Sequence, residues 1–158
     1  MAFRTGSLIT PHTFREFMTP NYRKIAEFAR QHGIEVILVD SDGQIEDLTE
    51  LMLEAGVTAL YPYEVQSDND VARVRDRFPT VGCVGGLDKQ VMARGKDAID
   101  REMKRARTLI EKGRFIPGPD HFVLSDVSLA NYRYFMEELR EVVMTTTPCQ
   151  SEGLTHSR

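Results

Sequence analysis

The sequence is poor in cysteine and has no long apolar run. Its 158 residues include two cysteines, Cys83 and Cys149, which are too few for a disulfide framework and form no metal-binding motif. No apolar stretch approaches the ~18 residues that a membrane helix needs. The first twelve residues, MAFRTGSLITPH, lack the apolar core of a signal peptide. We therefore expect a cytoplasmic protein that does not enter a membrane.

The chain also lacks a strong excess of charge of either sign. It carries 20 basic and 24 acidic residues, a formal net charge of -4, and the two signs alternate in DREMKRARTLIEK, as on a solvated helix face. This balance gives no electrostatic reason to expect a nucleic-acid partner. The length suits one domain with a core, which we place at residues 1–144. The polar, aperiodic residues 145–158 are predicted to be a disordered tail.

Strand-like and helix-like segments alternate along the chain. Thr10-Pro11 and Thr19-Pro20 each predict a helix start, because a capping hydroxyl precedes a proline. Strand-like segments then begin near residues 35, 57, 80 and 114, and a helical pattern follows each of them. This order predicts an α/β fold with a parallel sheet. Four such units form either a small open sheet or half of a (β/α)8 TIM barrel, and the pattern does not distinguish them.

The first strand-like segment, EVILVD at 35–40, is continuous and apolar. Strands with this pattern are covered on both faces, so we expect it to be fully buried. It ends in Asp40-Ser41-Asp42-Gly43, which places two carboxylates one residue apart.

Polar residues follow the end of every predicted strand. In both candidate architectures the chemistry lies at the carboxyl ends of the strands. A single acidic residue there is often only a helix cap, but the fold would bring all four strand ends to one rim. We expect five side chains to share that rim: Asp40, Asp42, Glu64, Asp88 and His121.

Five stretches of the chain resemble, in order, the C-terminal half of the uroporphyrinogen decarboxylase superfamily. They are LITPHTFREFMTPNYRKI, VDSDGQIEDLTELMLEAGV, YPYEVQSDNDV, GCVGGLDKQVMARG and PDHFVLSDVSLANYRYF. The superfamily includes uroporphyrinogen decarboxylase and methyltransferases that move methyl groups between a corrinoid protein and coenzyme M or another thiol. The resemblance implies strands five to eight of a TIM barrel. It further implies a truncated product or one half of a split barrel, inactive in isolation.

The resemblance also suggests a metal site. The superfamily's methyltransferases hold zinc with a His-x-Cys pair after strand five and a Cys after strand eight, and these positions fall on Asp40, Asp42 and His121. Two carboxylates and an imidazole suit a divalent zinc, iron or manganese ion. An ion-free polar pocket is the alternative, with the aspartates capping the next helix or binding substrate. In either case we expect Asp42 and His121 to be catalytic.

Four further residues are predicted to bind substrate: Glu64, Gly86, Asp88 and Asp120. Gly85-Gly86 stands where the decarboxylases carry a Gly-Asn pair. Glycines there allow the backbone to approach a ligand closely, although a tight turn would select them equally well.

Three functions are consistent with these residues. Corrinoid-linked methyl transfer is favoured by the Gly-Gly-x-Asp stretch and the occupied ligand positions, with the corrinoid carried by a partner protein. Porphyrinogen decarboxylation is the second, although its arginine-rich motifs and catalytic aspartate belong to the other half of the barrel. The third is a non-catalytic half-barrel that acts in assembly. Because half a barrel has two open sheet edges, we expect a homodimer or a complex with a separate N-terminal half.

Overall fold

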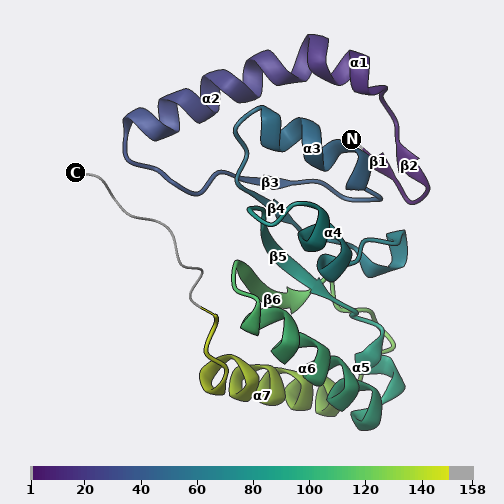
Figure 1. Cartoon of the computed structure of the whole chain (residues 1–158). Helices are drawn as coiled ribbons and strands as arrows, with labels where there is room; N and C mark the ends of the chain where they lie inside the picture. Colours follow the sequence, from purple (N-terminus) through teal and green to yellow (C-terminus); the bar gives the residue numbers. More distant parts are fainter. Residues whose placement is uncertain (1, 150–158) are drawn as a thin grey trace.

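The computed structural model describes residues 2–149 and contains a four-stranded parallel sheet (Figure 1). Its strands lie in the order β3 (Leu38–Asp40), β4 (Ala59–Tyr61), β5 (Gly82–Leu87) and β6 (Phe115–Pro119). The connecting helices are α3 (Glu46–Glu54), α4 (Val71–Arg77), and α5 (Val91–Arg94) with α6 (Lys96–Glu111). Helix α2 (Thr19–Gln31) precedes the sheet and α7 (Leu129–Thr145) follows it. The predicted α/β fold is confirmed, and it is consistent with half of a TIM barrel.

Two small elements lie outside this series of strands and helices. A two-stranded hairpin, β1 (Ala2–Phe3) and β2 (Gly6–Ser7), lies at the N-terminus, and a 3-10 turn, η2 (Val65–Ser67), follows β4. Among the described residues, none of the helices is long and apolar enough to cross a membrane.

The helices cover one face of the sheet. Cross-strand register aligns Val39, Leu60, Cys83 and Phe115 in one row, and the last three of these are buried in the core beneath the helices. Alternate residues point to the opposite, inner face. There Leu38 is 48% and Ile116 66% exposed. Cys83, the free thiol of this row, is 1% exposed and belongs to the core.

The prediction that residues 35–40 form a fully buried strand is wrong. Only Leu38–Asp40 pairs in the sheet, as its edge strand, and Val36 is 69% exposed. The described residues leave the inner face and this edge uncovered. The apolar run at 35–40 is therefore typical of a strand covered on both faces, and residues 2–149 do not supply that cover.

The N-terminal helical segment has helix starts at both predicted positions, but only the first has the predicted cap. Thr10 caps α1 (Pro11–Thr13) by accepting a bond from the Thr13 amide at 3.1 Å. Helix α2 begins at Thr19 with Pro20 in its first turn, as predicted, but the chain enters it through a π-helical turn, η1 (Phe14–Met18). The Thr19 hydroxyl does not cap this helix and donates instead to the Phe14 carbonyl at 3.4 Å. Proline lacks the amide hydrogen that an α-helix needs at this position, and the wider turn accommodates it.

The last helix ends at Thr145, and the next residues lie against α6. Arg107 Nη1 donates to Thr146 Oγ1 at 3.1 Å, and the Cys149 amide donates to the Glu111 carbonyl at 2.7 Å. The rest of the predicted tail, residues 150–158, lies outside the described residues, so its disorder stays a prediction.

Candidate functional site

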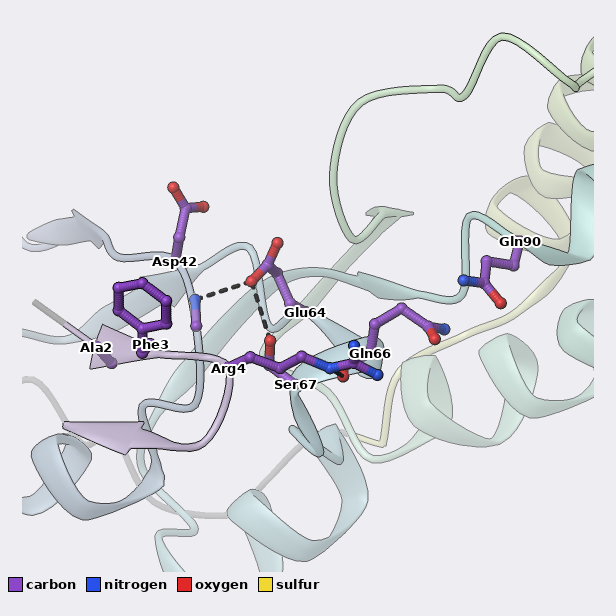
Figure 2. Close-up of a pocket in the computed structure, with 9 residues that line it drawn as sticks. Ala2, Phe3, Arg4, Asp42, Glu64, Gln66, Ser67 and Gln90 are labelled. Carbon is purple, nitrogen blue, oxygen red and sulfur yellow. Dashed lines mark hydrogen bonds between the residues drawn. The ribbon is translucent and has the colours of Figure 1, made fainter.

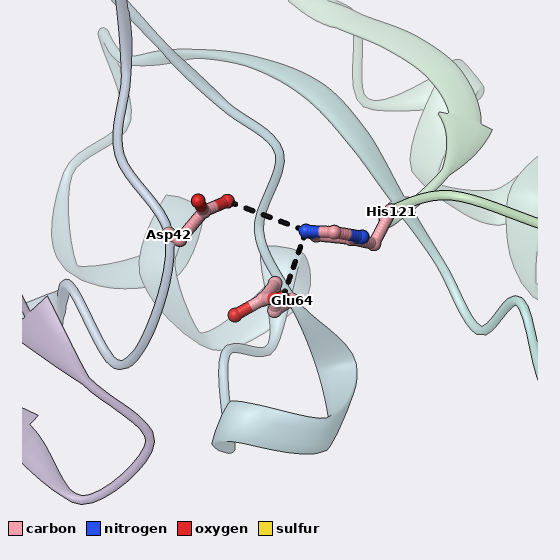
Figure 3. Close-up of side chains that lie close together, drawn as sticks. All are labelled: Asp42, Glu64 and His121. Carbon is pink, nitrogen blue, oxygen red and sulfur yellow. Dashed lines mark ion pairs between the residues drawn. The ribbon is translucent and has the colours of Figure 1, made fainter.

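Three side chains from three different strand ends converge at one place (Figure 3). Asp42 follows β3, Glu64 follows β4 and His121 follows β6. His121 Nε2 lies 3.7 Å from Asp42 Oδ1 and 3.6 Å from Glu64 Oε1. One donor atom from each residue lies within 4.8 Å of the other two. We call these three residues the acid–histidine cluster.

Two hydrogen bonds orient the Glu64 carboxylate within the cluster. Its Oε2 atom accepts bonds from the Gly43 amide at 2.8 Å and from Ser67 Oγ at 3.2 Å. This leaves Oε1 directed at His121. Gly43 has φ +81° and an added Cβ would lie 2.6 Å from the Ala2 carbonyl oxygen, so only glycine fits this turn against β1.

A hollow of about 430 Å³ lies beside the cluster (Figure 2). Asp42 and Glu64 contribute to its wall, and Arg4 crosses it to donate from Nε to the Gln66 carbonyl at 3.1 Å. The other lining residues are Ala2, Phe3, Gly43, Ser67 and Gln90. The volume falls in the range of small-molecule sites, so the cluster has room for a ligand on this side.

Asp40 is not a member of the cluster. It is the last residue of β3, and its exposed side chain shares the inner face with Leu38. We expected Asp40 and Asp42 to converge because they are two residues apart. The strand ends at Asp40 and the chain turns at Gly43, so strand alternation does not carry on to Asp42. Of the predicted metal ligands the structure brings together Asp42 and His121, with Glu64 as the third donor.

Asp120 lies in a different environment from the substrate-facing one predicted. It is completely buried. Its Oδ2 atom accepts a bond from the Val65 amide at 2.8 Å, and its Oδ1 atom accepts one from the Lys89 amide at 3.0 Å. The Lys89 ammonium lies 3.8 Å from the same Oδ1. Asp120 therefore joins three strand-end loops and presents no surface to a substrate.

Asp88 organises the turn before α5. Its Oδ1 atom accepts bonds from Gln66 Nε2 at 3.1 Å and from the Gln90 amide at 2.9 Å, and its Oδ2 lies 3.3 Å from Arg94 Nη1. Gln66 and Gln90 both line the hollow, so Asp88 lies behind its wall.

Packing within the protein accounts for Gly85 and Gly86. An added Cβ at Gly85 would lie 2.4 Å from the Pro62 carbonyl oxygen, and one at Gly86 would lie 2.5 Å from Val71 Cγ2. The Gly86 carbonyl already accepts a bond from Arg105 Nη1 at 3.0 Å. Both glycines lie inside β5, where they pair with Pro117 and Gly118 of β6, so they do not form the tight turn that was the alternative interpretation. The predicted ligand contact of Gly86 stays a prediction.

Asn69 was missed at the sequence level. It is 2% exposed, and its side-chain amide links the Asp42 loop to the Glu64 loop. It lies in the polar stretch SDND, where asparagine is ordinary turn composition, so no local pattern distinguishes it.

Comparison with known proteins identifies the family. The family model described as Uroporphyrinogen decarboxylase (URO-D) matches residues 3–142. The chain belongs to the uroporphyrinogen decarboxylase family. No curated protein matches it by sequence. Among solved structures, a methyltransferase from Methanosarcina mazei superposes with a TM-score of 0.61 at 18% identity.

That superposition covers 90% of this chain and 40% of the methyltransferase chain. At this identity the likeness shows the fold alone. This member of the uroporphyrinogen decarboxylase family therefore spans less than half the length of that protein, and it aligns with only part of the larger fold.

Proposed function

We propose that the chain supplies the C-terminal half of the active site of a corrinoid-linked methyltransferase, with Asp42, Glu64 and His121 holding a divalent metal ion. The observation that carries the proposal is the convergence of three donor atoms, within 4.8 Å of one another, at the carboxyl ends of parallel strands. Family membership and the fold likeness to a methyltransferase support it.

The donor types of the acid–histidine cluster fit such an ion. Two carboxylates and one imidazole suit zinc, iron or manganese, and they make a harder site than thiolates would. A bound ion would act as a Lewis acid that lowers the pKa of a thiol or water on it. Glu64 is already oriented by Gly43 and Ser67, and His121 turns Nε2 toward both carboxylates. The hollow would admit the methyl acceptor, and the corrinoid would come on a separate protein.

Metal analysis and calorimetry test the proposal. Protein purified without chelator is expected to carry close to one zinc, iron or manganese ion. Asp42→Asn, Glu64→Gln and His121→Ala should each lower the affinity for Mn²⁺ or Zn²⁺ by at least about tenfold. Asp40→Asn is the matched control and should change it less than about twofold. Sub-stoichiometric metal that is unaffected by Glu64→Gln would contradict the proposed ligand set.

Porphyrinogen decarboxylation is the second candidate function. It is favoured by the direct contacts of His121 with two carboxylates, at 3.6 and 3.7 Å. A histidine held in this way can transfer protons without a metal. If the protein binds no metal and His121→Ala abolishes porphyrinogen decarboxylation, this candidate would be favoured over methyl transfer. A non-catalytic role in assembly would leave both activities absent from the complete complex.

The open inner face leads to a proposal about the partner. The chain has helices at both ends of its four-stranded sheet, α2 before β3 and α7 after β6. A complete barrel has one helix for each strand. If two copies closed into a barrel, α7 of one copy and α2 of the other would both lie where the two sheets meet, and a barrel has one helix at that position. We propose that the preferred partner is a segment with four strands and only three helices, because such a barrel would have room for both α2 and α7.

A further inference from the structure

Two buried polar side chains, Asn69 and Asp120, connect the loops that carry the acid–histidine cluster. We propose that they are positioning residues that set the spacing of the cluster. Asn69 fixes Asp42 relative to Glu64, and Asp120 fixes Glu64 relative to His121. This inference rests on the cluster being the functional site proposed above.

Asp120 acts on the backbone next to two cluster residues. It immediately precedes His121, and its Oδ2 atom accepts the amide of Val65, the residue after Glu64, at 2.8 Å. Its own amide donates to the Leu87 carbonyl at 2.8 Å, and its Oδ1 accepts the Lys89 amide at 3.0 Å. One buried carboxylate thus fixes the β6 loop against the β4 and β5 loops. The separation between Glu64 and His121 follows from this attachment.

Asn69 does the same between the first two loops. Its Nδ2 donates to the Gly43 carbonyl at 2.8 Å and to the Glu64 carbonyl at 3.0 Å. Its Oδ1 accepts a bond from the Ile45 amide at 3.2 Å. Gly43 follows Asp42 directly, so these bonds fix the backbone on which Asp42 and Glu64 are carried.

The cluster needs this support because its own side chains are partly solvated. The Asp42 side chain is 67% exposed and His121 is 30% exposed. Side chains with this freedom meet reproducibly only if their backbones are fixed, which is the role of residues behind a metal or catalytic site.

Glu102 provides a matched comparison. It is also a buried carboxylate that accepts a loop amide, that of Asp88, at 2.9 Å. Asp88 is the neighbour of Lys89, so Glu102 and Asp120 act on adjacent amides of the same loop. The hydrogen bonds of Glu102 go to Asp88 and Arg105, and these residues flank neither Glu64 nor His121.

The experiment compares Asp120→Asn with Glu102→Gln in the full chain, with two readouts. Calorimetric titration with Mn²⁺ alone measures the cluster as a metal site, and Asp120→Asn should lower the affinity about 10–100-fold. The NMR signal of the Gly43 amide, which donates to Glu64 Oε2 at 2.8 Å, reports the Glu64 position without metal. It should move in Asp120→Asn and stay in place in Glu102→Gln, which should also keep Mn²⁺ affinity within about twofold.

The outcomes separate this inference from the proposed function. If the wild type binds no Mn²⁺, the metal proposal fails and the Gly43 signal alone decides the positioning role. If Asp120→Asn does not fold, Asn69→Ser is the second variant and should displace the same signal. Equal effects of Asp120→Asn and Glu102→Gln, or an unmoved Gly43 signal in Asp120→Asn, would overturn the inference.

Discussion

Both faces of the sheet carry apolar side chains, but helices cover only one of them. On the outer face Leu60 and Cys83 are packed beneath helices, at 0% and 1% exposure. On the inner face Leu38 and Ile116 are exposed to solvent. In a sheet with one face exposed to water, the strands alternate apolar residues on the covered face with polar residues on the exposed face. The difference therefore indicates that this sheet is built to be covered on both sides, while the described residues cover only one.

The helices differ in the same way. A helix in the middle of the series buries its apolar residues, whereas the two helices at the ends expose theirs. Helix α6 buries Ile99, Met103 and Leu109, whereas α2 exposes Ile25 and Phe28. Helix α7 exposes Leu129, Met136 and Val143. In a complete barrel the neighbouring helices of the ring would lie beside these two end helices.

The largest expected effect compares two isoleucines. Ile99 on α6 is completely buried and Ile116 on β6 is 66% exposed. Ile99→Ala should lower the free energy of unfolding by about 2–5 kcal/mol, through lost burial and the resulting cavity. In monomeric protein, at a concentration too low for association through the inner face, Ile116→Ala should lower it by less than about 0.5 kcal/mol. Urea denaturation measures both, and equal losses would show that the inner face is buried in solution.

Two glycines allow the same comparison between an open position and a packed one. Gly33, at the end of α2, has φ +72° and open space around an added Cβ, whereas Gly85 in β5 has φ +91° and meets Pro62. Gly33→Ala should cost about 1 kcal/mol, from backbone strain alone. Gly85→Ala adds a steric clash, so about 3 kcal/mol is expected. Similar unfolding midpoints for the two variants would mean that β4 and β5 separate more easily than the structure implies.

Local signals predicted the order of elements well. Short polar residues cap the helices of this series: Asp70 Oδ1 accepts the Ala72 amide at 2.7 Å at the start of α4, and Ser128 Oγ accepts the Asn131 amide at 3.2 Å at the start of α7. These features depend on neighbouring residues only. The burial of residues 35–40 was predicted wrongly because an apolar run reports the environment it suits, not whether a partner is there.

The site was only partly predictable for a similar reason. That Asp42, Glu64 and His121 follow strand ends can be read from the alternation of elements. The exclusion of Asp40 depends on the turn at Gly43, and the burial of Asp120 depends on amides 55 and 31 residues away in the chain. Such contacts between distant loops leave no local pattern in a single sequence.

Association through the inner face is the next expected effect. Each apolar side chain that a partner buries contributes about 1.5–3 kcal/mol, so the wild type should show a mass above that of the monomer in light scattering. Ile116→Glu should shift the mass toward the monomer, and Ile116→Val, which keeps the apolar surface, should not. A monodisperse wild-type monomer with cooperative unfolding would show that the open face needs no partner.

The smallest expected effect concerns Glu102, a charge enclosed on the covered side of the molecule. Burial raises the pKa of its carboxyl above the ordinary value of 4.5, although Arg105 and the Asp88 amide act in the opposite direction. Just above pH 4.5 the native state therefore keeps a proton on Glu102 that the unfolded chain has released. Because the native state binds more protons in this window, the free energy of unfolding should fall as the pH rises through it.

Glu102→Gln removes this titration and so isolates it. The substitution loses a charge-assisted bond to Arg105, and its cost relative to wild type should be greatest below the window and smaller above it. Glu141→Gln on the exposed side of α7 controls for the loss of one negative charge. Chemical denaturation from pH 4 to pH 7 measures the difference. A cost that grows with pH would mean that the pairing with Arg105, not burial, dominates at Glu102, and the covered side would then be more solvated than its packing indicates.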